Sequence, residues 1–129
     1  MDSARIAHND DDAEFPFREG CFIAEWWNVE DDAAVSVARA RVEPGVTTRR
    51  HRLHGIAERY VVLEGEGCVE VGERGPETVG PGAVVLIPPG AVQRITNHGC
   101  TDLVFLAVCT PRFRIECYED VDGPRSRGS

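Results

Sequence analysis

Short apolar runs alternate with polar residues along most of the chain, and no segment keeps the 3.6-residue period of an amphipathic helix. Alternation with a period of two is typical of strands that bury one face. Glycine and proline separate the runs, which indicates turns. The pattern predicts strands at residues 21–29, 35–43, 49–54, 58–64, 67–72, 83–88, 92–97 and 101–109, with a short final run at 112–117.

So many short strands in one domain-sized chain predict an all-β fold, either a closed double-sheet barrel or a sandwich. The period also predicts which side chains share a face. In the run 101–109, one face carries Leu103, Phe105, Ala107 and Cys109. The polar segments at the two ends predict an acidic N-terminal arm at 1–19, a barrel domain at 20–118 and a C-terminal tail at 119–129.

Charge and cysteine content narrow the possible partners. The chain has 22 acidic and 14 basic residues and a formal net charge of -8, so its mean field repels nucleic acid and anionic membrane surfaces. We therefore expect neither as a partner, and no apolar run is long enough to span a bilayer. The 5 cysteines are widely spaced with no Cys-x-x-Cys pair, which favours buried free thiols in a reducing cytoplasm.

Two segments carry candidate chemistry. In the first, a turn near Gly55 would bring His51 and Glu58 close together across a hairpin. Imidazole nitrogen and carboxylate oxygen suit a divalent first-row metal, although histidines near turns are more often exposed and inert. In the second, the turn at 88–90 places Gln93 on the next strand, where its amide could reach the same cavity.

The spacing of these two segments resembles the paired motifs of the cupin superfamily. Four positions of the first motif are present as Gly45, His51, Glu58 and Gly65. Four positions of the second are present as Gly82, Pro88, Gly90 and Asn97. The ending of the chain is also similar to that of small single-domain cupins, some of which are described as mannose-6-phosphate isomerase-like. The resemblance implies a cupin-type double-stranded β-helix, which is a jelly-roll barrel, and a homodimer.

The same resemblance implies a metal site that this chain keeps only in part. The family's ligands are two histidines and a glutamate of the first motif and a histidine of the second. Here His51 and Glu58 remain, whereas Leu53 and Gln93 occupy the other two positions. His54 lies one residue late and would face the opposite way on a regular strand. The candidate metal ligands are therefore His51, Glu58, Gln93 and His54, holding Fe, Mn, Ni or Zn weakly or not at all.

Three hypotheses follow for the function. The first is an isomerase, epimerase, decarboxylase or dioxygenase that uses a divalent metal on a small polar metabolite, with Glu58 and Tyr60 as candidate catalytic residues. The second is a non-catalytic module that binds a sugar or carboxylate through the same residues. The third is a structural barrel without a ligand. Arg59 and Arg94 are expected to point away from the cavity, because each is one residue out of step with Glu58 or Gln93.

Overall fold

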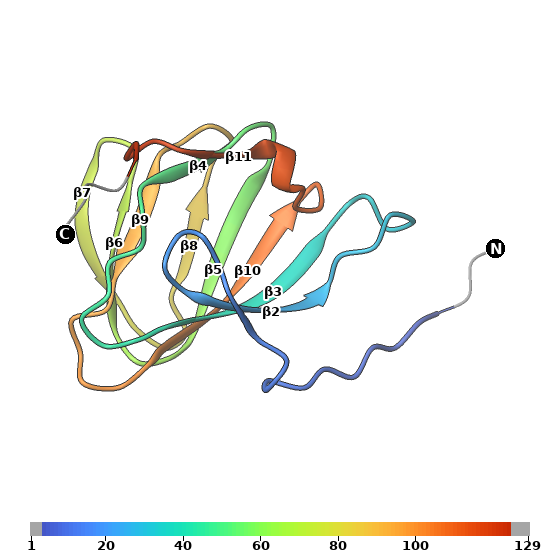
Figure 1. Ribbon diagram of the computed structural model, residues 1–129, viewed down its shortest axis with the longest axis horizontal. Coiled ribbons are helices and arrows are strands. Elements are labelled where there is room, and N and C mark those ends of the chain that lie inside the picture. The colour runs from blue at the N-terminus through green and yellow to red at the C-terminus, as the bar shows by residue number, and fades with distance from the viewer. Residues whose placement is uncertain (1–3, 125–129) are drawn as a thin grey trace.

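The computed structural model describes residues 4–124 and is built almost entirely of antiparallel strands (Figure 1). Its elements in chain order are β1 (Phe15–Pro16), β2 (Phe22–Trp27), β3 (Ser36–Val42), β4 (His51–Leu53), β5 (Ala57–Glu64), β6 (Gly67–Val71), β7 (Arg74–Val79), β8 (Val84–Ile87), β9 (Gln93–Thr96), β10 (Leu103–Thr110), the 3-10 turn η1 (Ile115–Cys117) and β11 (Tyr118–Asp120). None of the helical segments in residues 4–124 is long and apolar enough to cross a membrane.

The strands form two sheets that enclose a common interior. The six-stranded sheet has the order β1-β2-β3-β10-β5-β8, and the five-stranded sheet has the order β11-β4-β9-β6-β7. Consecutive strands such as β4 and β5 belong to different sheets, so the chain crosses repeatedly between them, as Figure 1 shows. This arrangement confirms the prediction of an all-β, double-stranded β-helix.

The core lies between the sheets and follows the predicted alternation. Leu103, Phe105 and Cys109 of β10 are buried, and their neighbours across β3 include the buried Ala40 and Ser36. Each fully buried aliphatic or aromatic side chain contributes roughly 1.5–3 kcal/mol relative to leaving it in water. The inward faces of β3, β5 and β10 therefore hold the barrel together around the interior from which the site is built.

The predicted strand pattern missed β1, β7 and β11 and included one strand that is absent. Strand β7 was not predicted, because the residues from Arg74 to Thr78 are all exposed and carry no apolar alternation. The predicted strand at 112–117 is instead a loop followed by η1. Its Phe113 N–H donates to the Ser36 hydroxyl at 2.8 Å and therefore has no strand partner. The pattern could not reveal this, since the bond joins residues far apart in the chain.

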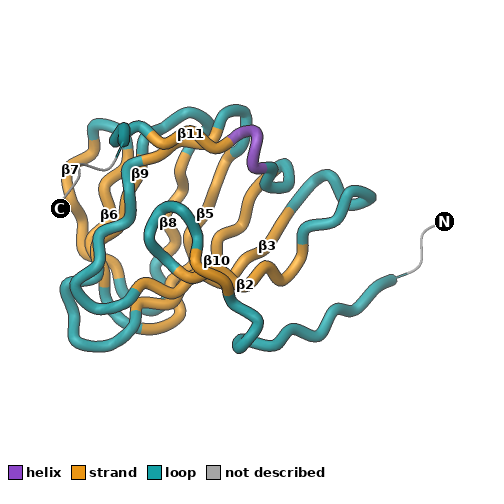
Figure 2. Tube along the Cα trace, viewed as in Figure 1, coloured by secondary structure: helices purple, strands orange, loops and turns teal. Residues whose placement is uncertain are grey.

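Strands that pair with the barrel lie beyond both of the predicted domain boundaries, at residues 19 and 118. Before the first boundary, β1 pairs with β2, while the residues preceding β1 form the long loop seen in Figure 2. After the second, β11 pairs with β4 and brings Asp120 opposite His51. The division into arm, barrel and tail stays a prediction, but structural residues of the barrel extend at least from β1 to β11.

Three apolar side chains remain exposed on the outer face of the six-stranded sheet, at Leu63, Val84 and Leu86. They lie on the neighbouring strands β5 and β8. A homodimer stays a prediction, and sedimentation analysis would test it. This exposed apolar face is a candidate contact surface for the second copy.

Candidate functional site

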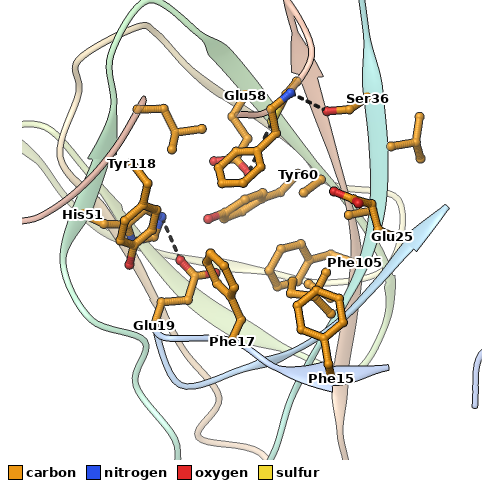
Figure 3. A pocket seen from close by; sticks show the side chains of 18 residues that line it. Phe15, Phe17, Glu19, Glu25, Ser36, His51, Glu58, Tyr60, Phe105 and Tyr118 are labelled. Carbon is orange, nitrogen blue, oxygen red and sulfur yellow. Dashed lines mark hydrogen bonds and ion pairs between the residues drawn. The ribbon is translucent and has the colours of Figure 1, made fainter. Parts of the chain in front are cut away.

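A pocket of about 80 Å³ opens between the two sheets (Figure 3). Most of its wall is aromatic or aliphatic. Its lining residues with polar side-chain atoms are Glu19, Glu25, Ser36, His51, Glu58, Tyr60, Cys109 and Tyr118. A mainly apolar cavity with a few polar groups is the usual form of a small-molecule site. The pocket contains both retained residues of the predicted metal motif, His51 and Glu58.

His51 lies on β4, directly opposite Gln93 of β9, and its side chain is almost fully buried. Its Nδ1 lies 2.8 Å from the Arg49 carbonyl oxygen, which can only accept, so Nδ1 carries a proton. Its Nε2 lies 2.9 Å from the Glu19 carboxylate. Burial alone would lower the pKa of His51, but the hydrogen bond and the charge of Glu19 outweigh it and raise this pKa to about 9. At neutral pH, His51 is therefore an imidazolium in an ion pair.

Glu19 is the functional residue that sequence reasoning missed, because it falls in the segment predicted to be an arm. A tight turn places it: the Phe17 N–H donates to the Cys21 carbonyl at 2.8 Å, and Gly20 adopts a φ of 104. The carboxylate then lies inside the barrel, where it also accepts a hydrogen bond from the Cys21 thiol at 3.2 Å. An isolated glutamate before a glycine carries no sequence signal for this position.

Tyr118 also contributes to the site without having been predicted. Its ring stacks on the His51 imidazole, with centroids 5.1 Å apart and an angle of 15° between the planes. Strand β11 places it there by pairing with β4. The stacked ring covers His51 on one side and, together with the Glu19 pair, fixes the orientation of the imidazole.

Glu58, Gln93 and Tyr60 form a hydrogen-bonded chain across the interior. The Gln93 amide donates to Glu58 Oε1 at 2.8 Å, and the Tyr60 hydroxyl donates to the Gln93 carbonyl oxygen. All three side chains are buried. The structure thus brings Glu58 and Gln93 together, an arrangement that strand parity alone left open for Gln93, and it adds Tyr60 as the group that orients the Gln93 amide.

The environment of Glu58 shifts its pKa into the neutral range. Burial raises the pKa of Glu58 to about 7, and the negative charge of Glu19 acts in the same direction, while the Gln93 hydrogen bond and the His51 charge oppose it. Its second oxygen contacts only the Cys109 thiol, at 3.9 Å. Both protonation states are accessible near neutral pH, and one oxygen is left without a strong protein partner.

Tyr60 lines the pocket on the same face as Glu58, whereas His54, offered as a candidate metal ligand, lies outside it. Burial raises the pKa of Tyr60 well above its ordinary value, so its hydroxyl stays protonated and acts through Gln93. His54 is not brought to the site: it is exposed, and its Nε2 lies 2.6 Å from a Glu119 carboxylate oxygen. The reason is the strand period, because Leu53 at the preceding position points inward and is buried.

The residues present do not fit a tightly held metal ion. Within residues 4–124, no three His, Cys, Asp or Glu side chains converge as a metal ion requires. Two of the remaining donors already have protein partners: His51 Nε2 pairs with Glu19, and the Gln93 carbonyl oxygen accepts from Tyr60. Because Leu53 and the outward-facing His54 supply nothing, the donor set lacks the number of ligands that strong binding of these metals needs.

The arginines lie outside the pocket as predicted. Arg94 pairs with Glu70 at 2.7 Å, and Arg59 donates to the Thr110 hydroxyl at 2.5 Å. No arginine or lysine is among the residues that line the pocket. Its polar chemistry is therefore that of carboxyl groups, one paired imidazolium, hydroxyls and a thiol.

The comparisons with known proteins agree with this architecture. The family model described as "Cupin domain" matches residues 38–109, more than half of the chain. A comparison with curated proteins found no match.

Several solved structures share the fold. A predicted oxalate decarboxylase from Thermotoga maritima is 24% identical with a TM-score of 0.73, and the alignment covers 83% of this chain and 99% of that one. An uncharacterised Klebsiella pneumoniae protein with a double-stranded β-helix domain is 19% identical with a TM-score of 0.69, over 84% of this chain and 91% of that one. The Streptomyces nucleoside dehydratase Pac13 is 16% identical with a TM-score of 0.72, over 91% and 92% of the two chains.

Proposed function

Because the chain belongs to the cupin family, we propose that it binds a small metabolite in its barrel pocket and that Glu58 exchanges a proton with that metabolite without a resident metal. The observation that carries this proposal is the state of Glu58. It lines the pocket, its pKa is raised to about 7, and one of its oxygens has no strong protein partner. A general acid or base works best when its pKa lies near the working pH.

The residues around Glu58 support such a role. Gln93, held by Tyr60, fixes one carboxylate oxygen, so the other is the oxygen available to a ligand. In an isomerisation or epimerisation, this oxygen would take a proton from a substrate carbon beside a carbonyl group and return a proton to the same molecule. Such a reaction needs no oxidant, reductant or second substrate.

The fold neighbours include proteins described by activities in which protons move. One is described as a predicted oxalate decarboxylase and another as a nucleoside dehydratase. Their low identities support only the shared barrel as a scaffold for small-molecule chemistry. Elimination of water is therefore a third proton-transfer reaction to examine, beside isomerisation and epimerisation.

The experiment begins with a thermal-shift screen of a metabolite library against the wild-type protein and the Glu58→Gln variant. This substitution keeps an oxygen that can accept from Gln93, so the variant should fold and still bind the ligand. Each ligand found is then incubated with both proteins in D₂O, and NMR follows exchange of its carbon-bound protons and the formation of product.

We expect wild type to catalyse exchange or conversion and Glu58→Gln to bind the same ligand with turnover lowered at least about 100-fold. Equal turnover by both proteins would refute the role of Glu58. Binding by both proteins with turnover by neither would establish the second function, a non-catalytic binding module. That alternative is supported by the hydrogen bonds that Gln93 and His51 already make to protein groups, which a purely structural polar cluster would also show.

A further inference from the structure

Acidic side chains outnumber basic ones in the lining of the pocket. Glu19, Glu25 and Glu58 all line it, and among the described residues the only basic side chain that does so is His51. The single imidazolium is already neutralised by Glu19 at 2.9 Å. An anionic ligand would therefore enter a site in which the positive charge of His51 already has a counter-ion. The acidic side chains nearby would repel it.

The three carboxyl groups play different parts. Glu19 is committed to His51, whereas Glu58 is more than nine-tenths buried and has an oxygen that contacts only a thiol at 3.9 Å. Glu25 lies at the rim of the pocket, where Figure 3 shows its carboxylate, and accepts a hydrogen bond from the Asn28 amide at 2.9 Å. A ligand in the pocket thus lies between one buried and one exposed carboxyl group.

The remainder of the wall is unusually rich in aromatic rings. The rings that line the pocket are those of Phe15, Phe17, Tyr60, Phe105, Phe113 and Tyr118. Phe17 makes edge-to-face contacts with Phe113 and Tyr118, at centroid distances of 6.2 and 5.5 Å. The faces of aromatic rings carry partial negative charge and attract cations within about 6 Å.

The same rings already interact with a cation of the protein. The Arg18 guanidinium lies 5.4 Å from the centroid of Tyr118 and 5.9 Å from that of Phe17. Arg18 does not itself line the pocket. These contacts show that the rings attract a cation, but Arg18 and His51 already lie against Phe17 and Tyr118. A cationic ligand would therefore use the rings that no charged side chain of residues 4–124 covers, those of Phe15, Phe105 and Phe113.

We propose that the pocket selects a small organic cation, an amine or quaternary ammonium compound, over a carboxylate or phosphate of the same shape. This inference rests on the proposed function, since it names the ligand class of the same pocket. The aromatic rings would surround the apolar groups of the cation, and Glu58 and Glu25 would balance its charge. It departs from the carboxylate ligand that the sequence left open, because no arginine of residues 4–124 lines the cavity.

The test uses three probes of nearly equal shape and different charge: choline, 3,3-dimethylbutan-1-ol and 3,3-dimethylbutanoate. Each is titrated into the full-length protein at pH 7.5, and binding is followed by chemical-shift changes of the amides of the pocket strands. We expect choline to bind at least about tenfold more tightly than the carboxylate, with the neutral alcohol between them.

Glu25→Gln provides the variant arm, with Glu77→Gln as its matched control, because Glu77 is an exposed residue that does not line this pocket. Glu25→Gln should weaken choline binding about fivefold and leave the alcohol unchanged. Glu77→Gln should change neither.

Tighter binding of the carboxylate, equal binding of all three probes, or no binding of any probe at millimolar concentration would overturn the cation preference. None of these outcomes bears on whether Glu58 moves a proton, which the exchange experiment in D₂O decides separately.

Discussion

His51 and His54 each pair with a glutamate, but one pair is buried in the barrel and the other lies on its surface. His51 lies inside the barrel with Glu19 at 2.9 Å, and His54 lies on the surface with Glu119 at 2.6 Å. The side chain of His51 is 3% exposed and that of His54 is 59% exposed. Distance alone would rank the surface pair first, yet only the buried pair lines the pocket.

The difference teaches that burial, not proximity, decides what such a pair can do. Water screens the surface pair, so its interaction contributes little to stability. Inside the barrel, each charge depends on its partner, because an unpaired buried charge is costly. The strand period produces this contrast, since it turns Leu53 inward and leaves His54 outside.

The largest expected effect comes from removing one partner from each pair. Glu19→Gln should lower the free energy of unfolding by about 3–5 kcal/mol, because it leaves the His51 charge buried without a counter-ion. Glu119→Gln should lower it by no more than about 1 kcal/mol. Urea unfolding of the two variants and wild type measures both values, and equal losses would contradict the distinction.

The pH dependence of stability should differ in the same way. Because the pKa of His51 is raised from 6.5 to about 9 in the folded state, its stabilisation is present below pH 6.5 and is lost as pH rises through 9. The loss amounts to about 3 kcal/mol. The difference in unfolding free energy between wild type and Glu19→Gln should shrink over this range, while the difference from Glu119→Gln should not. A difference that grows with pH would show that the assignment is wrong.

A smaller effect separates the two tyrosines of the pocket. Tyr60→Phe should cost about 1–2 kcal/mol, because it leaves the buried Gln93 carbonyl oxygen without its donor. Tyr118→Phe is the matched control, since the buried Tyr118 hydroxyl has no hydrogen-bond partner within residues 4–124. It should cost no stability, because the hydroxyl that it removes makes no hydrogen bond. Thermal unfolding distinguishes the two, and equal costs would contradict the hydrogen-bonded chain.

The smallest expected effect is that of His54→Ala. It should change the free energy of unfolding by less than about 0.5 kcal/mol, because both partners of the pair are solvated. It should also leave binding of any ligand found by the thermal-shift screen unchanged. A loss of ligand binding in this variant would show that His54 is part of the site.

The sequence predicted the parts of the site that depend on strand period and turn spacing. Alternation together with the motif spacing was enough to expect Glu58 and Gln93 in one interior and Arg94 outside it, and the two side chains do meet there. It could not place Glu19 or Tyr118, because each reaches His51 through pairing between distant parts of the chain. For the same reason, β11 was missed, and β7 has too little apolar pattern to be recognised.

The central claim is that His51 and Gln93 are bound to protein groups and not to a metal. Metal analysis of protein purified without an affinity tag or added metal tests it most directly, combined with melting temperatures in the presence of Mn, Fe, Ni and Zn. Our account predicts less than about one tenth of an equivalent of any of these metals and no rise in melting temperature. Close to one equivalent of metal, lost together with the stabilisation in His51→Ala, would contradict it.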